Sequence, residues 1–205
     1  MAWEVLPWRS SRLELVGGIA GIVFTLLQLP NEIDSIQGAG TLLRQVADEL
    51  LAQRFPSGNM RSSLGSDRDR LVQWCHGATG LVPLMLLMAE VYHDQSYLEL
   101  ARTFGEVVWQ RGLLHGKGPG LCHGTPGNGY VFLALQRAAP AGDSRWLTRA
   151  RHFAVASACR VTDLMRNADR EYSLFEGVAG AYTFWSDVLR AEERLLEVSR
   201  FPCYE

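Results

Sequence analysis

Two short segments place a cysteine directly before a histidine and just ahead of a Gly-x-x-Gly motif. They read WCHGATG, residues 74–80, and CHGTPG, residues 122–127. Thiolate and imidazole are groups that zinc prefers, in tetrahedral sites that keep one position open when the metal is catalytic. The sequence therefore predicts a Zn²⁺ site on Cys75, Cys122 and His123, with a fourth position for water or a substrate thiol.

The two segments belong to a longer internal repeat. Gly-x-x-Gly motifs begin at Gly18, Gly77, Gly124 and Gly177, about 50 residues apart, a period typical of arrays of supersecondary units. Each motif is followed by a run that is apolar on more than one face, which predicts a buried helix. Pro83 falls near the start of its run and is expected in the first turn of that helix.

Amphipathic stretches precede these runs and predict outer helices. Their apolar faces are Leu43, Val46, Ala47 and Leu50, then Tyr97, Ala101, Phe104 and Val108, then Trp146, Ala150 and Phe153. Stacked hairpins of one outer and one inner helix give an all-α solenoid or a closed α/α ring. The glycine- and proline-rich segments Phe55–Asn59 and His115–Gly120 are expected to be loops on the side of the Gly-x-x-Gly motifs. Neighbouring repeats place equivalent positions side by side, so Cys75 and Cys122 should lie close together.

Each cysteine taken alone also has a simpler interpretation, because a cysteine is often only a small buried apolar residue. That interpretation holds for Cys159 and Cys203, which have no neighbouring histidine. The repeated Cys-His pair favours metal binding for the other two. A ligand set with two sulfurs suits the activation of a soft thiolate, and no HExxH motif supports a zinc protease.

Length and charge restrict the remaining classes. The 205 residues are expected to form one domain, 1–205, and the net charge of −2 offers no basic surface for nucleic acid. The apolar segment 13–30 admits two interpretations, a signal or anchor sequence and a helix buried in protein. It is shorter than a membrane-spanning helix requires and contains several glycines, which favours the buried helix and predicts no integral membrane segment.

The motifs together resemble the LanC-like (lanthionine synthetase C-like) proteins, eukaryotic relatives of the bacterial lanthionine cyclases. The matching segments are GGIAGI, FPSGN, DRDRLVQWCHGATG, VVWQRGLL, GPGLCHGTPGNGYVFLAL, SLFEGVAG and the final FPCYE. The resemblance implies an α/α toroid of seven helical hairpins around a zinc ion held by Cys75, Cys122 and His123. It also implies activation of a thiol, that of glutathione in the eukaryotic relatives, for addition to dehydroamino acids in a peptide or protein.

The resemblance extends to residues that would handle the substrate. Lys117 matches a family lysine that contacts glutathione, and a cation there suits a carboxylate. Arg70 lies in a charged loop that could steer an anionic substrate, although charged loop residues are more often only solvated. Gly17 stands where family members usually have a histidine that acts as acid or base. His76 and His115 are therefore the candidates for proton transfer.

The resemblance also has limits that keep other functions open. Four Gly-x-x-Gly motifs predict a partial ring of about four hairpins, truncated on its N-terminal side, and residues 1–16 match nothing in the family pattern. With Gly17, this leaves as alternatives a non-catalytic scaffold that binds zinc or glutathione and an inactive truncated product. The family resemblance implies a cytoplasmic protein, with peripheral association at the plasma membrane as the alternative.

Overall fold

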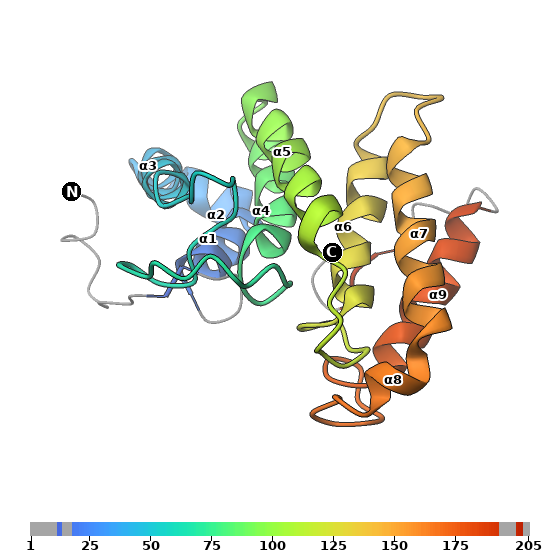
Figure 1. Cartoon of the computed structure of the whole chain (residues 1–205). Helices are drawn as coiled ribbons and strands as arrows, with labels where there is room; N and C mark the ends of the chain where they lie inside the picture. The colour runs from blue at the N-terminus through green and yellow to red at the C-terminus, as the bar shows by residue number, and fades with distance from the viewer. Residues whose placement is uncertain (1–11, 14–17, 193–199, 203–205) are drawn as a thin grey trace. The chain divides into compact units, whose positions relative to one another are not determined.

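The computed structural model describes residues 12–13, 18–192 and 200–202 (Figure 1). Within them the regular structure is helical, and the only β-type pairings are the isolated bridges Arg12–Ser63 and Arg54–Met60. The helices are α1 (Ile19–Leu27), α2 (Pro30–Ser35), α3 (Ala39–Leu51), α4 (Ala78–Val91), α5 (Gln95–Arg111), α6 (Thr125–Arg137), α7 (Arg145–Cys159), α8 (Val161–Met165) and α9 (Val178–Glu192). The expected all-α class is confirmed.

The apolar segment 13–30 contains the nine-residue helix α1. Across the described ranges, no helix combines the length and the apolar character needed to cross a bilayer.

Each Gly-x-x-Gly motif lies at the start of a helix, as the repeat predicts. Gly18, Gly77 and Gly124 directly precede α1, α4 and α6, and α9 begins right after Gly177. The segments Phe55–Asn59 and His115–Gly120 are loops. The short helices α2 and α8 have no counterpart in the sequence pattern.

The chain divides into two compact units. The first contains the described residues up to Leu71 and Cys75–Phe104, and the second contains Val72–Trp74 and the described residues from Gly105 onward. Helix α5 contributes its N-terminal part to the first unit and its C-terminal part to the second.

In the first unit, α1 packs against α3 and α4. The predicted apolar face of α3 is buried. At the start of α5, the hydroxyl of Tyr97 donates to Oδ1 of Asp48 on α3 at 3.1 Å. The hydroxyl of Tyr92, at the end of α4, donates to the carbonyl of Gly40 at 2.7 Å. These two hydrogen bonds fix α3 to the turn between α4 and α5.

Pro83 does not lie in the first turn of its helix. Helix α4 begins at Ala78, so the proline is inside it. The expectation was wrong because Gly77 ends the preceding loop earlier than the apolar pattern alone indicates. A proline at an interior position removes one hydrogen bond from the helix.

In the second unit, α6 lies against α7 and α9, and these two also pack against each other (Figure 1). All residues of α6 from Thr125 to Leu135 are buried, as expected for an inner helix. The ring centroid of Phe132 lies 4.8 Å from that of Phe153 and 6.2 Å from that of Trp146. The predicted apolar face of α7 thus forms the aromatic core with α6.

Two of the other inner helices are less completely buried than the sequence predicts. Leu26 on α1 is 36% exposed, and Tyr182 and Leu189 on α9 are 65% and 61% exposed. Each of these helices buries some of its apolar side chains and leaves others exposed to solvent. The expectation of burial on several faces holds for α6 and is wrong for α1 and α9.

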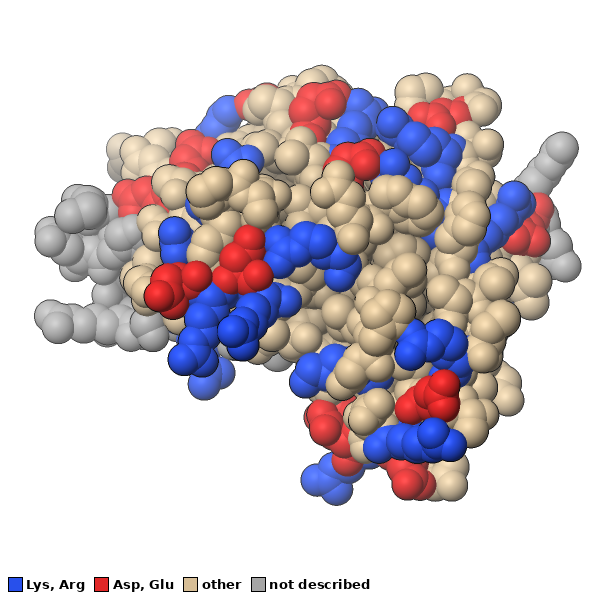
Figure 2. Space-filling view, in the orientation of Figure 1, with Lys and Arg blue, Asp and Glu red and all other residues tan. Residues whose placement is uncertain are grey.

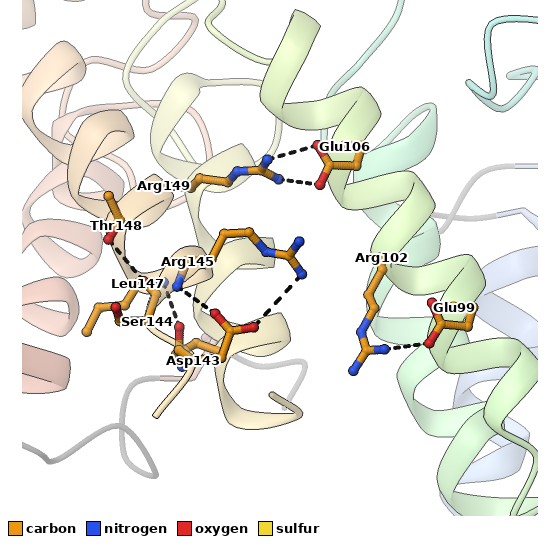
Figure 3. Close-up of polar contacts among 10 residues, drawn as sticks. Glu99, Arg102, Glu106, Asp143, Ser144, Arg145, Leu147, Thr148 and Arg149 are labelled. Carbon is orange, nitrogen blue, oxygen red and sulfur yellow. Dashed lines mark hydrogen bonds and ion pairs between the residues drawn. The ribbon is translucent and has the colours of Figure 1, made fainter. Parts of the chain in front are cut away.

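A half-buried arginine connects α5 and α7 in the second unit. Arg149 on α7 donates two hydrogen bonds to the carboxylate of Glu106 on α5, at 2.8 and 2.9 Å (Figure 3). Its guanidinium carbon lies 5.0 Å from the ring centroid of Trp109 and 4.7 Å from that of Trp146. Elsewhere on the face shown in Figure 2, basic and acidic side chains are interspersed, as expected for a net charge near zero.

Candidate functional site

The loop that carries Cys75 is closed at both ends by one buried asparagine. Asn59, 1% exposed, donates from Nδ2 to the carbonyl of Leu71 at 3.0 Å and accepts from the N–H of Ala78 at 2.8 Å. Gly77 has a φ of +89°, and a Cβ there would lie 2.1 Å from the Leu71 carbonyl oxygen. The first glycine of this motif is therefore required by both conformation and space.

The residues just before Cys75 are fixed in the second unit. The buried amide of Asn128 donates to the carbonyl of Val72 at 2.8 Å. The ring of Trp74 stacks on Phe201 with centroids 4.6 Å apart. Cys75 follows Trp74 through one peptide bond, so these contacts also restrict where its thiol can lie.

The loop that carries Cys122 is held through its main chain. The N–H of Leu121 donates to the carbonyl of Leu174 at 3.3 Å, and the N–H of Cys122 donates to that of Phe175 at 2.8 Å. At Gly127 a Cβ would lie 1.8 Å from the Leu121 carbonyl oxygen. The second glycine of this motif thus lets the first turn of α6 approach the backbone of the cysteine loop.

These loops bring the three predicted metal ligands together. One ligand atom each from Cys75, Cys122 and His123 lies within 4.8 Å of the others. Cys75 is buried, and the other two are half-buried. With Zn–S and Zn–N bonds of about 2.3 and 2.0 Å, ligand atoms at this separation can share one ion after small side-chain adjustments. The donor set of two thiols and one imidazole fits zinc, and its role as a metal site stays a prediction.

The other predicted site residues lie on loops around this group. His76 is half-buried next to Cys75, whereas His115 is exposed and its Nδ1 contacts the guanidinium of Arg160. Lys117 and Arg70 are exposed. Exposure agrees with the predicted role, because a charged side chain must be accessible to attract a substrate from solution. The catalytic roles of His76 and His115 and the substrate-binding roles of Lys117 and Arg70 stay predictions.

Two predictions concern residues that the structure does not cover. Gly17, the replacement for the usual histidine, and Cys203 lie outside the described residues. Cys159 is exposed at the end of α7, so it is not the small buried residue that the sequence suggested.

The sequence did not identify several residues that shape the site. Asn59 and Asn128 lie within the motifs FPSGN and GTPGNG, and a polar amide inside a glycine-rich turn could have marked them. Thr125 accepts at Oγ1 from the N–H of Leu114 at 3.0 Å, which anchors the loop of His115 and Lys117.

Asp169 is a further residue near the site that no sequence pattern indicates. Its Oδ2 lies 2.8 Å from Nε2 of His123. The two residues are 46 positions apart in the chain, and no spacing rule connects them.

The family model of the lanthionine synthetase C-like proteins matches residues 15–204. The chain is 38% identical over 188 residues to glutathione S-transferase LANCL1 of Danio rerio, covering 92% of this chain and 44% of that protein. It is 37% identical over 195 residues to LanC-like protein GCL1 of Arabidopsis thaliana, covering 92% of this chain and 42% of that protein. The chain therefore spans less than half the length of these relatives.

The fold is similar to that of nisin cyclase, with a TM-score of 0.70 at 15% identity. The match covers 96% of this chain and 52% of the cyclase. Together with the helical structure, this match confirms the expected fold class, part of an α/α toroid.

Proposed function

Since the chain belongs to the lanthionine synthetase C-like family, we propose that it binds zinc and a thiol substrate and forms thioethers on peptides. Cys75, Cys122 and His123 would hold the metal, and the observation that carries the proposal is the proximity of their ligand atoms, within 4.8 Å. A zinc ion bound there would keep a coordinated thiol ionised as thiolate at neutral pH.

Glutathione is the thiol we propose, and a dehydroamino acid in a peptide or protein is the acceptor. A relative that is 38% identical carries the name glutathione S-transferase. Glutathione is anionic, and the exposed cations Lys117 and Arg70 offer partners for its carboxylates. The reducing cytoplasm, where we place the protein, supplies glutathione and keeps the cysteines as thiols.

The addition of the thiol to the dehydroamino acid forms one C–S bond and requires one proton. The sulfur of the thiolate forms a C–S bond to the β-carbon of the dehydroamino acid, the electron pair of the C=C bond moves to the α-carbon, and a proton is added there. His76 is the better-placed donor, because it is half-buried and adjacent to Cys75. His115 is exposed, and its Nδ1 is already in contact with the guanidinium of Arg160.

The test combines metal analysis with turnover. The purified chain is expected to hold one zinc and to convert a dehydroalanine peptide and glutathione into the thioether, detected by mass spectrometry. Replacing both ligands, Cys75→Ala and Cys122→Ala, should abolish zinc binding and turnover. Cys159→Ala is the matched control, because Cys159 is exposed at the end of α7, and it should change neither. Full turnover by the double variant would rule out the proposed mechanism.

A non-catalytic role is the second candidate, favoured by Gly17 at the position where the family usually has a histidine. In that case the chain would bind zinc and glutathione but yield no thioether. Calorimetric titration with glutathione alongside the turnover assay separates the two functions.

A further inference from the structure

The candidate metal ligand His123 has a polar partner on a different loop. Its Nε2 lies 2.8 Å from Oδ2 of Asp169, which precedes α9 in the chain. The side chain of His123 is 15% exposed, and that of Asp169 is 63% exposed. Within the described residues, the compact group of potential ligands contains His123 and not Asp169. The carboxylate therefore contacts the histidine from outside that group.

The chemistry of the two groups determines which ring nitrogen is available for a metal. A carboxylate can only accept a hydrogen bond, so the hydrogen between the two residues belongs to Nε2 of His123. A neutral imidazole carries one hydrogen, and Nδ1 then has the unshared electron pair. With Nε2 engaged by Asp169, Nδ1 is the atom that His123 can offer to zinc.

The backbone around Asp169 is held in place by the cysteine loop. The neighbouring residue Ala168 packs against Gly118, where an added Cβ would lie 2.8 Å from the Ala168 Cα. On the other side, the carbonyl of Phe175 accepts the N–H of Cys122 at 2.8 Å. The chain that carries Asp169 is thus attached to the ligand loop on both sides, which explains how an exposed carboxylate keeps a fixed relation to His123.

We propose that Asp169 is a positioning residue of the metal centre. It holds the Nε2–H tautomer and the ring orientation of His123 so that Nδ1 faces the ion. Carboxylate partners of metal-bound histidines act in this way elsewhere, and their loss typically lowers metal affinity about 10- to 100-fold. The inference rests on the proposed zinc site, and it adds a residue outside the three ligands.

The test measures zinc affinity and the histidine tautomer separately. By competition with a chromophoric chelator, Asp169→Ala is expected to bind zinc about 10- to 100-fold more weakly than the parent chain. Asp169→Asn keeps an oxygen that can accept the hydrogen bond, so it should recover most of the affinity. Asp163→Ala is the matched control, because Asp163 is a similarly exposed aspartate that pairs with Arg166, and it should leave the affinity unchanged.

The second measurement is a long-range nitrogen–proton NMR spectrum of the chain labelled at histidine. The parent is expected to show His123 as the Nε2–H tautomer, with and without zinc, and Asp169→Ala should show loss of that single tautomer in the zinc-free chain. Zinc affinity of Asp169→Ala within threefold of the parent, or an unchanged tautomer, would overturn the proposal. If the parent itself bound no zinc, the proposed function would fail, while the spectrum of the zinc-free chain would still test the His123–Asp169 pair.

Discussion

Replacing Asn59 by alanine should destabilise the first unit and loosen the loop of Cys75. The amide of Asn59 makes hydrogen bonds with Leu71, Ala78 and Oδ1 of Asp69, the last at 2.8 Å. A neutral hydrogen bond contributes about 1 kcal/mol and one to a carboxylate about 2 kcal/mol. Asp69 is half-buried, so water replaces part of its lost bond. We therefore expect Asn59→Ala to cost about 3 kcal/mol.

The assay is equilibrium urea unfolding of the full chain with a chelator present, so that metal binding does not contribute. The free energy of unfolding should fall while the urea dependence of that free energy stays unchanged. Asn167→Ala is the matched control, because the exposed amide of Asn167 makes only a 3.5 Å contact with the carbonyl of Asp163. We expect the control to stay within about 0.5 kcal/mol of the parent.

A second measurement connects this asparagine to the metal centre. Zinc affinity of Asn59→Ala should also fall, because Asn59 closes the loop that carries Cys75 and the ion would then have to order that loop. A loss of stability below about 0.5 kcal/mol would show that the three hydrogen bonds do not hold the loop, and the argument for its pre-organisation would be refuted.

Two further predictions concern contacts away from the site. Arg149→Ala should lower the free energy of unfolding in urea by about 1–2 kcal/mol, because it removes a bidentate ion pair and two ring contacts. The control Arg102→Ala breaks the exposed pair with Glu99 and should lower it by less than about 0.5 kcal/mol. Equal losses for the two variants would contradict this ranking. Burial and then the charge of Asp48 raise the pKa of Tyr97 to about 12. The resulting stabilisation of the fold is present below the ordinary tyrosine pKa of about 10 and is lost as the pH rises toward 12. In an ultraviolet titration, Tyr97→Phe should therefore remove a phenol that ionises at higher pH than the others. A titration curve unchanged by the substitution would contradict the raised pKa of Tyr97.

The repeat made the three potential zinc ligands predictable from the sequence. Equivalent positions in adjacent hairpins lie side by side, so Cys75 and Cys122 could be paired across a long sequence separation, and the structure places their ligand atoms close to each other and to His123. The same regularity predicted an inner helix at each motif, although α4 begins earlier than the expected position of Pro83 implied. It gave no information on Asp169 or Arg149, whose partners depend on how one loop or one helix face meets another.

The burial of the individual helices was less predictable. Composition alone treats α1, α6 and α9 alike, as apolar runs after a Gly-x-x-Gly motif. Their exposure depends instead on which faces the neighbouring helices cover, which the runs do not encode. In α6, every residue from Thr125 to Leu135 is buried, whereas α1 and α9 each leave large apolar side chains exposed.

The attachment of the Cys122 loop through main-chain hydrogen bonds has an evolutionary consequence. Carbonyl groups are common to all residues, so the hydrogen bond that the main chain of Phe175 accepts from Cys122 does not depend on which side chain stands at position 175. Substitutions at the residues that supply these carbonyl groups can change the side chains around the Cys122 sulfur without moving the sulfur. Selection on the geometry should instead act on the glycines, where any side chain would push the two backbones apart.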